Sequence, residues 1–155
     1  MAYKYKARRI RRSKQPTDRS VRAGGFLVST SQIVAYTYTA TDPCKVCNLS
    51  LEIGLDDNTD ANSEKVYYAV VYVPEGYNVN TMQVTDVTQD LYNPTKNIMV
   101  VGVLTNDGGG AKKTFSRVSR KMAVGDRIAL IINRVNNGST QDNTGNFVLQ
   151  FTTVH

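Results

Sequence analysis

Residues 66–73 read VYYAVVYV, and residues 74–76, which follow at once, read PEG. The run is apolar on both of the faces that a strand would have, is rich in β-branched and aromatic residues, and is too short for an ordinary helix. Proline and glycine then end it, because proline cannot donate a hydrogen bond to a strand ladder. We interpret residues 66–73 as a central strand that is buried on both faces.

Two stretches on the N-terminal side of this run alternate with period two. Every even position of residues 34–41 is aromatic or small and apolar, and every odd position of residues 47–55 is apolar. Asp42 and Pro43 separate the two stretches. This alternation predicts two strands that each bury one face. In the second of them, Cys47 is expected to face the core and Val46 to face away from it.

The rest of the body continues the strand pattern. Residues 98–104 and 128–132 are apolar on both faces, residues 114–121 predict a half-exposed strand, and residues 147–151 alternate again. These segments give seven strands, and an eighth is either Phe26–Ser29 or part of residues 82–87. The fold class is therefore all-β, an antiparallel two-sheet sandwich, and eight strands would make a jelly roll. The absence of tryptophan disfavours an immunoglobulin-like sandwich.

The first 22 residues form a block of positive charge. They hold nine basic residues and one acid, Asp18, which gives a net charge of 9 − 1 = +8. The whole chain has 19 Lys and Arg and 13 Asp and Glu, so residues 23–155 carry 10 − 12 = −2. Like charges keep a segment solvated. We therefore expect a disordered arm at residues 1–22, a flexible joint at Ala23-Gly24-Gly25, and one domain at residues 23–155.

A polycationic arm is typical of a nucleic-acid-binding protein, because it releases the counterions that condense on a phosphate backbone. Tyr3 and Tyr5 interleave with lysines, which suits stacking on unpaired bases. The alternative is a solvated tail or a targeting signal, and residues 8–12 have the basic density that nuclear import receptors read. The predicted nucleic-acid-binding residues are Lys4, Lys6, Arg8, Arg9, Arg11, Arg12, Lys14, Arg19 and Arg22.

A second basic cluster lies in residues 112–121, which contain no acid. It is a weaker candidate for nucleic-acid binding, since positive charges also protect the edge of a sheet from aggregation. It could also contact an acidic neighbour such as the loop at Asp56 and Asp57. The basic residues of this cluster are Lys112, Lys113, Arg117, Arg120 and Lys121.

The sequence carries no recognisable pattern for catalysis or for cofactor binding. The only histidine is His155, so no Ser-His-Asp triad can form. Gly108-Gly109-Gly110 lacks the Gly-Lys-Ser/Thr ending of a phosphate-binding loop. Cys44 and Cys47 have the spacing of half a zinc site, but no second pair exists. We predict no enzyme activity, no cofactor and no metal site.

Two further predictions concern calcium binding by residues 56–64 and membrane insertion. Oxygen-bearing side chains stand at every second position from Asp56 to Glu64, as at the start of a calcium-binding loop, but Ala61 stands where such a loop needs glycine. A solvated acidic loop is the prediction, and a calcium site at a subunit contact is the alternative. No apolar run reaches the length of a membrane span, and no signal peptide is visible, so we expect no membrane insertion.

Several short segments occur in an order that resembles one group of viral proteins. They are the basic arm, residues 38–41 (YTAT) ahead of a cysteine-bearing strand, 70–76 (VVYVPEG), 91–99 (LYNPTKNIM), 119–121 (SRK) and 125–128 (GDRI). Over roughly residues 1–135 this order resembles the single jelly-roll capsid proteins of small circular Rep-encoding single-stranded DNA (CRESS-DNA) viruses. The Asn-rich segment 133–146 departs from the pattern and leaves the last loop unassigned.

The resemblance implies an eight-stranded viral jelly roll that self-assembles into an icosahedral shell of about sixty copies. It further implies that the arm packages a single-stranded DNA genome, or host nucleic acid, inside the virion. It also implies assembly in the host nucleus, reached through a host nuclear import receptor. Two other functions fit the residues alone: a cellular β-sandwich nucleic-acid-binding protein with a basic tail, and a glycan-binding β-sandwich lectin whose arm is a targeting signal.

Overall fold

The computed structural model describes residues 16–29, 31–56, 65–81, 97–105, 110–134 and 142–155. Almost all of its regular structure is strand, with one short 3-10 helix in the described residues. The strands are β1 (Thr17–Val28), β2 (Ile33–Thr39), β3 (Cys44–Leu55), β4 (Lys65–Val73), β5 (Ile98–Thr105), β6 (Lys112–Ser116), β7 (Arg120–Met122), β8 (Arg127–Arg134) and β9 (Asn143–Val154), and the helix is η1 (Val79–Thr81).

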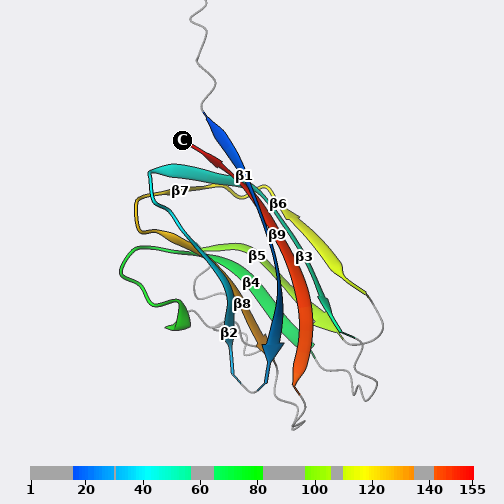
Figure 1. Cartoon of the computed structure of the whole chain (residues 1–155). Helices are drawn as coiled ribbons and strands as arrows, with labels where there is room; N and C mark the ends of the chain where they lie inside the picture. The colour runs from blue at the N-terminus through cyan, green and yellow to red at the C-terminus, as the bar shows by residue number, and fades with distance from the viewer. Residues whose placement is uncertain (1–15, 30, 57–64, 82–96, 106–109, 135–141) are drawn as a thin grey trace, which may run out of the picture.

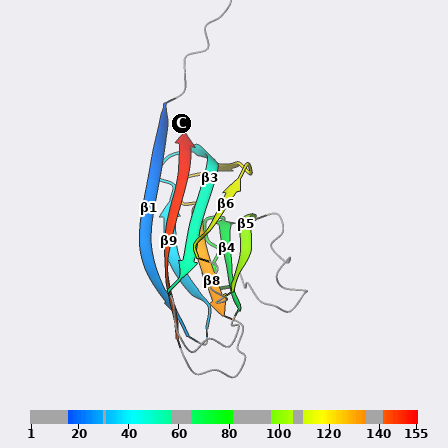
Figure 2. The same cartoon turned by 90° about the vertical axis from the view of Figure 1, so that its right-hand side faces the viewer.

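The strands form two antiparallel sheets that pack face to face (Figures 1 and 2). One sheet, here called the β1 sheet, has the order β1-β9-β3-β6, with β7 also paired to β3. The other, the β4 sheet, has the order β2-β8-β4-β5. Successive strands pass from one sheet to the other except at β4 to β5 and β6 to β7. With β6 and β7 counted as one interrupted strand, this is the predicted eight-stranded jelly roll.

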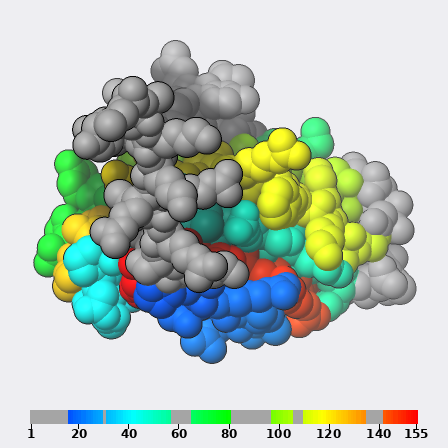
Figure 3. All heavy atoms as spheres, turned by 90° about the horizontal axis from the view of Figure 1, so that it is seen from above, coloured from blue at the N-terminus to red at the C-terminus, as the bar shows by residue number. Residues whose placement is uncertain are grey.

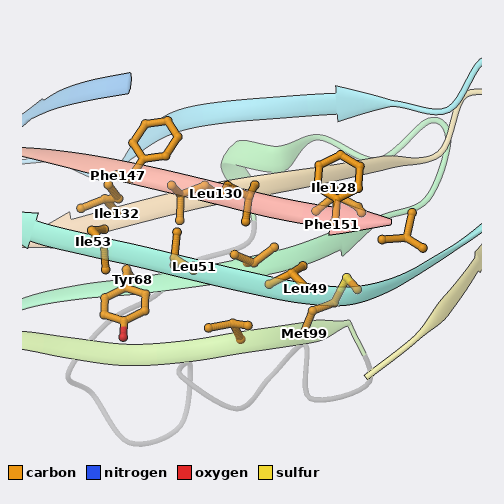
Figure 4. Close-up of a cluster of buried hydrophobic side chains, with 14 of the residues drawn as sticks. Leu49, Leu51, Ile53, Tyr68, Met99, Ile128, Leu130, Ile132, Phe147 and Phe151 are labelled. Carbon is orange, nitrogen blue, oxygen red and sulfur yellow. The ribbon is translucent and has the colours of Figure 1, made fainter. Parts of the chain in front are cut away.

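The main core lies between the two sheets (Figure 4). Alternate residues of β3 and β9 point inward from the β1 sheet and meet alternate residues of β4 and β8. Tyr68 is fully buried among them, and its hydroxyl lies 3.1 Å from Oγ1 of Thr114, so one hydrogen bond joins β4 to β6 across the sandwich. The fully buried large side chains include Leu49, Leu51, Ile53, Tyr68, Ile128, Leu130, Ile132, Leu149 and Phe151.

The other face of the β4 sheet is also buried. Ala69, Val71, Ala129 and Ile131 form a second apolar cluster there, and Val79 of η1 packs with them. β4 lies between β8 and β5, and β8 lies between β2 and β4. The prediction that residues 66–73 form a central strand buried on both faces is therefore confirmed.

The predicted orientation of the side chains at the start of β3 is wrong. Cys44 and Val46 are buried, whereas Cys47 is only half-buried. The register with β9 shifts between Cys47 and Ser50, and Asn48 has a φ of 53°. This bulge inserts a residue that has no direct partner and reverses the alternation, so Val46 and Leu49 both face the core. The two cysteines are free and lie on opposite faces of the strand.

The predicted strand at residues 114–121 is interrupted. β6 ends at Ser116 and β7 begins at Arg120, and the residues between them pair with no strand. The backbone N–H of Val118 donates to Oγ of Ser116 at 3.1 Å, which turns the chain at this point. Of the two candidates for the eighth strand, Phe26–Ser29 contributes to β1, and residues 82–87 lie outside the described residues.

The predicted boundary between arm and domain also needs correction. β1 begins at Thr17, so Arg19 and Arg22 belong to a strand and not to a disordered arm. The expected joint is not a hinge either, since Ala23, Gly24 and Gly25 pair with Val148, Phe147 and Asn146 of β9. The small residues at this place have a packing reason. A Cβ on Gly24 would come within 3.0 Å of the Phe147 ring.

This boundary predicts different results from two truncations. Removal of residues 1–15 deletes no part of β1, whereas removal of residues 1–22 deletes the pairs from Thr17↔Val154 to Arg22↔Leu149. We expect the shorter deletion to leave the melting temperature nearly unchanged. The longer one should lower it by about 5–10 °C, because several ladder hydrogen bonds are lost. Thermal melts followed by circular dichroism measure this, and equal melting temperatures would contradict the pairing.

Candidate nucleic-acid interface

The predicted arm residues divide into two groups. Lys4, Lys6, Arg8, Arg9, Arg11, Arg12 and Lys14 lie outside the described residues. Arg19 and Arg22 are exposed residues of β1, the edge strand of the β1 sheet. Nη2 of Arg19 donates to Oε1 of Gln150 on β9 at 2.7 Å, which holds the guanidinium against the sheet.

Thr17, the first residue of β1, lies in a row of paired residues that crosses the β1 sheet. It pairs with Val154 of β9, which pairs with Lys45 of β3, which in turn pairs with Lys121 of β7. Paired residues in neighbouring strands point to the same side of a sheet. Cys44, Val46 and Met122, which flank the two lysines along their strands, are buried, so Lys45 and Lys121 project from the outer face, away from the β4 sheet.

Figure 3 looks onto the end of the sandwich where this row lies, with the blue residues of β1 beside the red residues of β9. The chain enters the sheet at Thr17, and the last residue is tied there as well. The N–H of His155 donates to the carbonyl of Pro16 at 3.1 Å, and the imidazole Nε2 lies 3.6 Å from Oδ2 of Asp18. Residues 1–15, which hold seven basic residues and no acid, therefore connect to the domain at the edge of a face that carries two more lysines.

The second predicted cluster, residues 112–121, is not one patch. Lys113 lies on the outer face, where its ammonium is 3.9 Å from Oε2 of Glu52, and Lys121 lies on the same face. Arg117 is exposed in the connection between β6 and β7. Lys112 reaches instead toward the other sheet, where Nζ donates to the carbonyl of Val103 on β5 at 3.4 Å.

Arg120 has a structural role in the described part of the chain. Its guanidinium carbon lies 5.7 Å from the centroid of the Tyr72 ring, a cation–π contact. Nε of Arg120 is buried without a hydrogen-bond partner among the described residues. The side chain is thus committed to packing β7 against β4. Arg117 and Lys121 are exposed and make no ion pair with the described residues, whereas Lys113 is exposed and paired with Glu52.

Asp126 links the loops at this end of the sandwich through hydrogen bonds. Its carboxylate accepts hydrogen bonds from the hydroxyl of Tyr72 at 2.7 Å, from the N–H of Ala123 at 2.8 Å and from the N–H of Glu75 at 3.0 Å. Burial raises the pKa of the carboxyl, but these three donors lower it by more, so the pKa lies below its ordinary value. Burial and the bond to Asp126 raise the pKa of Tyr72.

Sequence reasoning missed Lys45 as a member of the basic face. It stands alone in the sequence, between two buried residues, and no local pattern marks it as part of a cluster. Only the pairing of β3 with β7 and β9 places it opposite Lys121 and in line with Thr17. The alternation of residues 47–55 did not place Lys45 on the outer face either, because the sequence does not reveal the bulge between Cys47 and Ser50.

The described residues contain no group of three His, Cys, Asp or Glu that could hold a metal ion. Of the suspected calcium loop they include Asp56, which accepts a hydrogen bond from Nδ2 of Asn146 at 3.0 Å, while residues 57–64 lie outside them. In the same part of the chain no helix is long and apolar enough to cross a bilayer.

The sequence matches no protein-family model and no curated protein. Solved structures do share its fold. A protein of the disulfide-linked pili of Bacillus endospore appendages superposes with a TM-score of 0.51 at 10% identity, over 92% of this chain and 91% of that one. The BFDV capsid protein, crystallised as a decamer, superposes with a TM-score of 0.51 at 11% identity, over 92% of this chain and 99% of that one.

A third structure is that of infectious bursal disease virus, Gx strain, with a TM-score of 0.52 at 9% identity. The match covers 92% of this chain but 34% of that much longer chain. At these identities the likeness shows the shared fold. It supports the eight-stranded jelly roll, which strand order and sheet pairing define independently.

Proposed function

We propose that this chain is a viral capsid protein, which self-assembles into a closed shell and packages single-stranded DNA through its basic N-terminal residues. The observation that carries the proposal is a combination: a jelly-roll body of near-neutral charge, with a +8 segment whose last residues lead into one face of a sheet. The likeness to the BFDV capsid protein over nearly the whole of both chains supports it.

The body and the N-terminal segment have separate tasks in this proposal. One apolar core lies between the two sheets, and a second lies on the other face of the β4 sheet. These cores make the body a rigid block, which suits repeated contacts with copies of itself. The N-terminal segment neutralises phosphates. With about sixty copies, residues 1–22, of net charge +8 in each copy, supply about 480 positive charges, enough for a similar number of phosphates. The virion is then the site of action, and residues 8–12 would engage a host nuclear import receptor for assembly in the nucleus.

The proposal predicts a steep salt dependence for single-stranded DNA, without preference for one sequence. At about 0.7 ions released per phosphate and eight net charges, the log of the association constant should fall against log salt with a slope of roughly −6. Fluorescence titration at several salt concentrations measures the slope. A flat dependence, or a strong preference among oligonucleotide sequences, would contradict packaging by the N-terminal segment.

A pilus-like subunit is the second candidate, because the pilus protein of the Bacillus endospore appendages shares the fold to the same degree. Those pili are linked by disulfides, and this chain has two free cysteines, of which Cys47 is half-buried on the outer face and Cys44 is buried. The net charge of +8 on residues 1–22 favours the capsid protein over the pilus subunit, because a filament has no need of a polycationic segment. Filaments that dissociate under reducing conditions would support the pilus.

A further inference from the structure

Phe115 is an exposed aromatic residue in the middle of β6. Its exposed fraction is 60%, and it pairs with Ser50 of β3, so it stands on the outer face of the β1 sheet. Nothing in the described part of the chain covers it. A phenylalanine ring in this position is available to another molecule.

Basic residues flank Phe115 along its own strand. Lys113 lies two residues before it on the same strand and face, with its side chain 68% exposed, and Arg117 follows two residues after it in the exposed connection to β7. Glu52 is the acid closest to Lys113 and already pairs with it. An aromatic ring between cations is the arrangement that proteins use to stack a base and hold its phosphates.

Lys45 and Lys121 extend the positive charge toward the start of β1. They stand directly opposite each other in an antiparallel pair, where like charges destabilise the sheet. Neither makes an ion pair with any residue that the structure describes. Their row lies about four residues, or roughly 13 Å, along the strands from Phe115. An anionic ligand that crosses the face would relieve this repulsion.

We propose that the outer face of the β1 sheet binds single-stranded nucleic acid, with an unpaired base stacked on Phe115. Lys113 and Arg117 contact the phosphates beside that base, and Lys45 and Lys121 contact the strand further along. This site rests on the proposed function and adds a second contact to the N-terminal segment. The row from Thr17 to Lys121 places the two contacts on one path, so a strand held by the arm passes onto this face.

The charges argue against a second copy of the same face as the occupant. Two such faces would bring lysines and arginines against each other, which costs free energy unless acids intervene. Duplex DNA is also disfavoured, because its bases are already stacked within the helix and offer no face to the ring. An unpaired strand satisfies both the cations and the aromatic ring.

The test uses the full chain and three variants: Phe115→Ala, Phe115→Trp and, as a matched control, Leu27→Ala. Leu27 is 53% exposed on the outer face at the far end of β1. The probes are a labelled (dT)20 strand and a duplex of equal length at one salt concentration. Phe115→Ala should weaken binding of the single strand by about 5- to 100-fold and of the duplex by less than about 2-fold. Phe115→Trp and Leu27→Ala should leave both within about 2-fold.

Photo-crosslinking of strands that contain 5-iodouracil should attach the base to the peptide that holds Phe115, as read by mass spectrometry. If the wild type binds (dT)20 and Phe115→Ala binds it equally well, the stacking site is wrong while the proposed function stands. If the wild type binds no nucleic acid, the proposed function fails first. If Phe115→Ala changes only the oligomeric state, the ring belongs to a subunit contact, which overturns this proposal.

Discussion

Replacement of Asp126 by alanine is expected to lower the free energy of unfolding by about 2–4 kcal/mol. Asp126 is 6% exposed and its carboxylate accepts three hydrogen bonds, and the change leaves the hydroxyl of Tyr72 and two backbone N–H groups without their acceptor. Chemical denaturation at neutral pH measures the loss. Asp42→Ala is the matched control, since Asp42 is an exposed acid on a neighbouring loop and should change stability little.

Acid should remove part of this contribution. The pKa of Asp126 in the folded protein lies below the unfolded value of 3.8, so unfolding takes up a proton at low pH. The stabilisation is complete above about pH 4 and is lost as the pH falls through the folded pKa. The stability gap between wild type and Asp126→Asn should therefore narrow below about pH 4 and stay constant from pH 5 to 7. A gap that widens with acid would contradict the assignment.

Neutralisation of the N-terminal charges is expected to empty the assemblies of nucleic acid. In a variant with Lys4, Lys6, Arg8, Arg9, Arg11, Arg12 and Lys14 changed to glutamine, the net charge of residues 1–22 falls from +8 to +1. The slope of the log association constant against log salt should then be only roughly −1. The affinity for single-stranded DNA at physiological salt should therefore drop by several orders of magnitude.

The matched control changes the three lysines to arginine and keeps every charge. It should package as the wild type does, because the binding reads charge rather than side-chain type. The ratio of absorbance at 260 nm to that at 280 nm, measured on purified assemblies, reports their nucleic-acid content. Assemblies of the glutamine variant that keep a normal content would show that the folded domain, with its basic outer face, holds the nucleic acid.

The sequence predicted those features that depend on local pattern. The run at residues 66–73 became β4 at the centre of its sheet, and the alternation at residues 147–151 became the inward face of β9. Polar loops with Gly and Pro set the number of strands, and that number implied the jelly roll.

The features that local pattern missed depend on partners far away in the sequence. β1 begins among basic residues, and only its pairing with β9 makes residues 17–22 a strand. The bulge at Asn48 turned Cys47 away from the core, against the alternation. Lys45 and Lys121 form a pair because β3 and β7 are neighbours. The exposed ring of Phe115 could not be told from a core residue by sequence, since both fit an apolar position in a strand.

Electron cryomicroscopy of the purified 155-residue chain shows whether it assembles into shells. We expect closed, uniform shells with density for nucleic acid inside, next to the surface from which the N-terminal segments emerge. Open filaments, or a protein that stays monomeric or dimeric while it binds nucleic acid, would contradict this expectation.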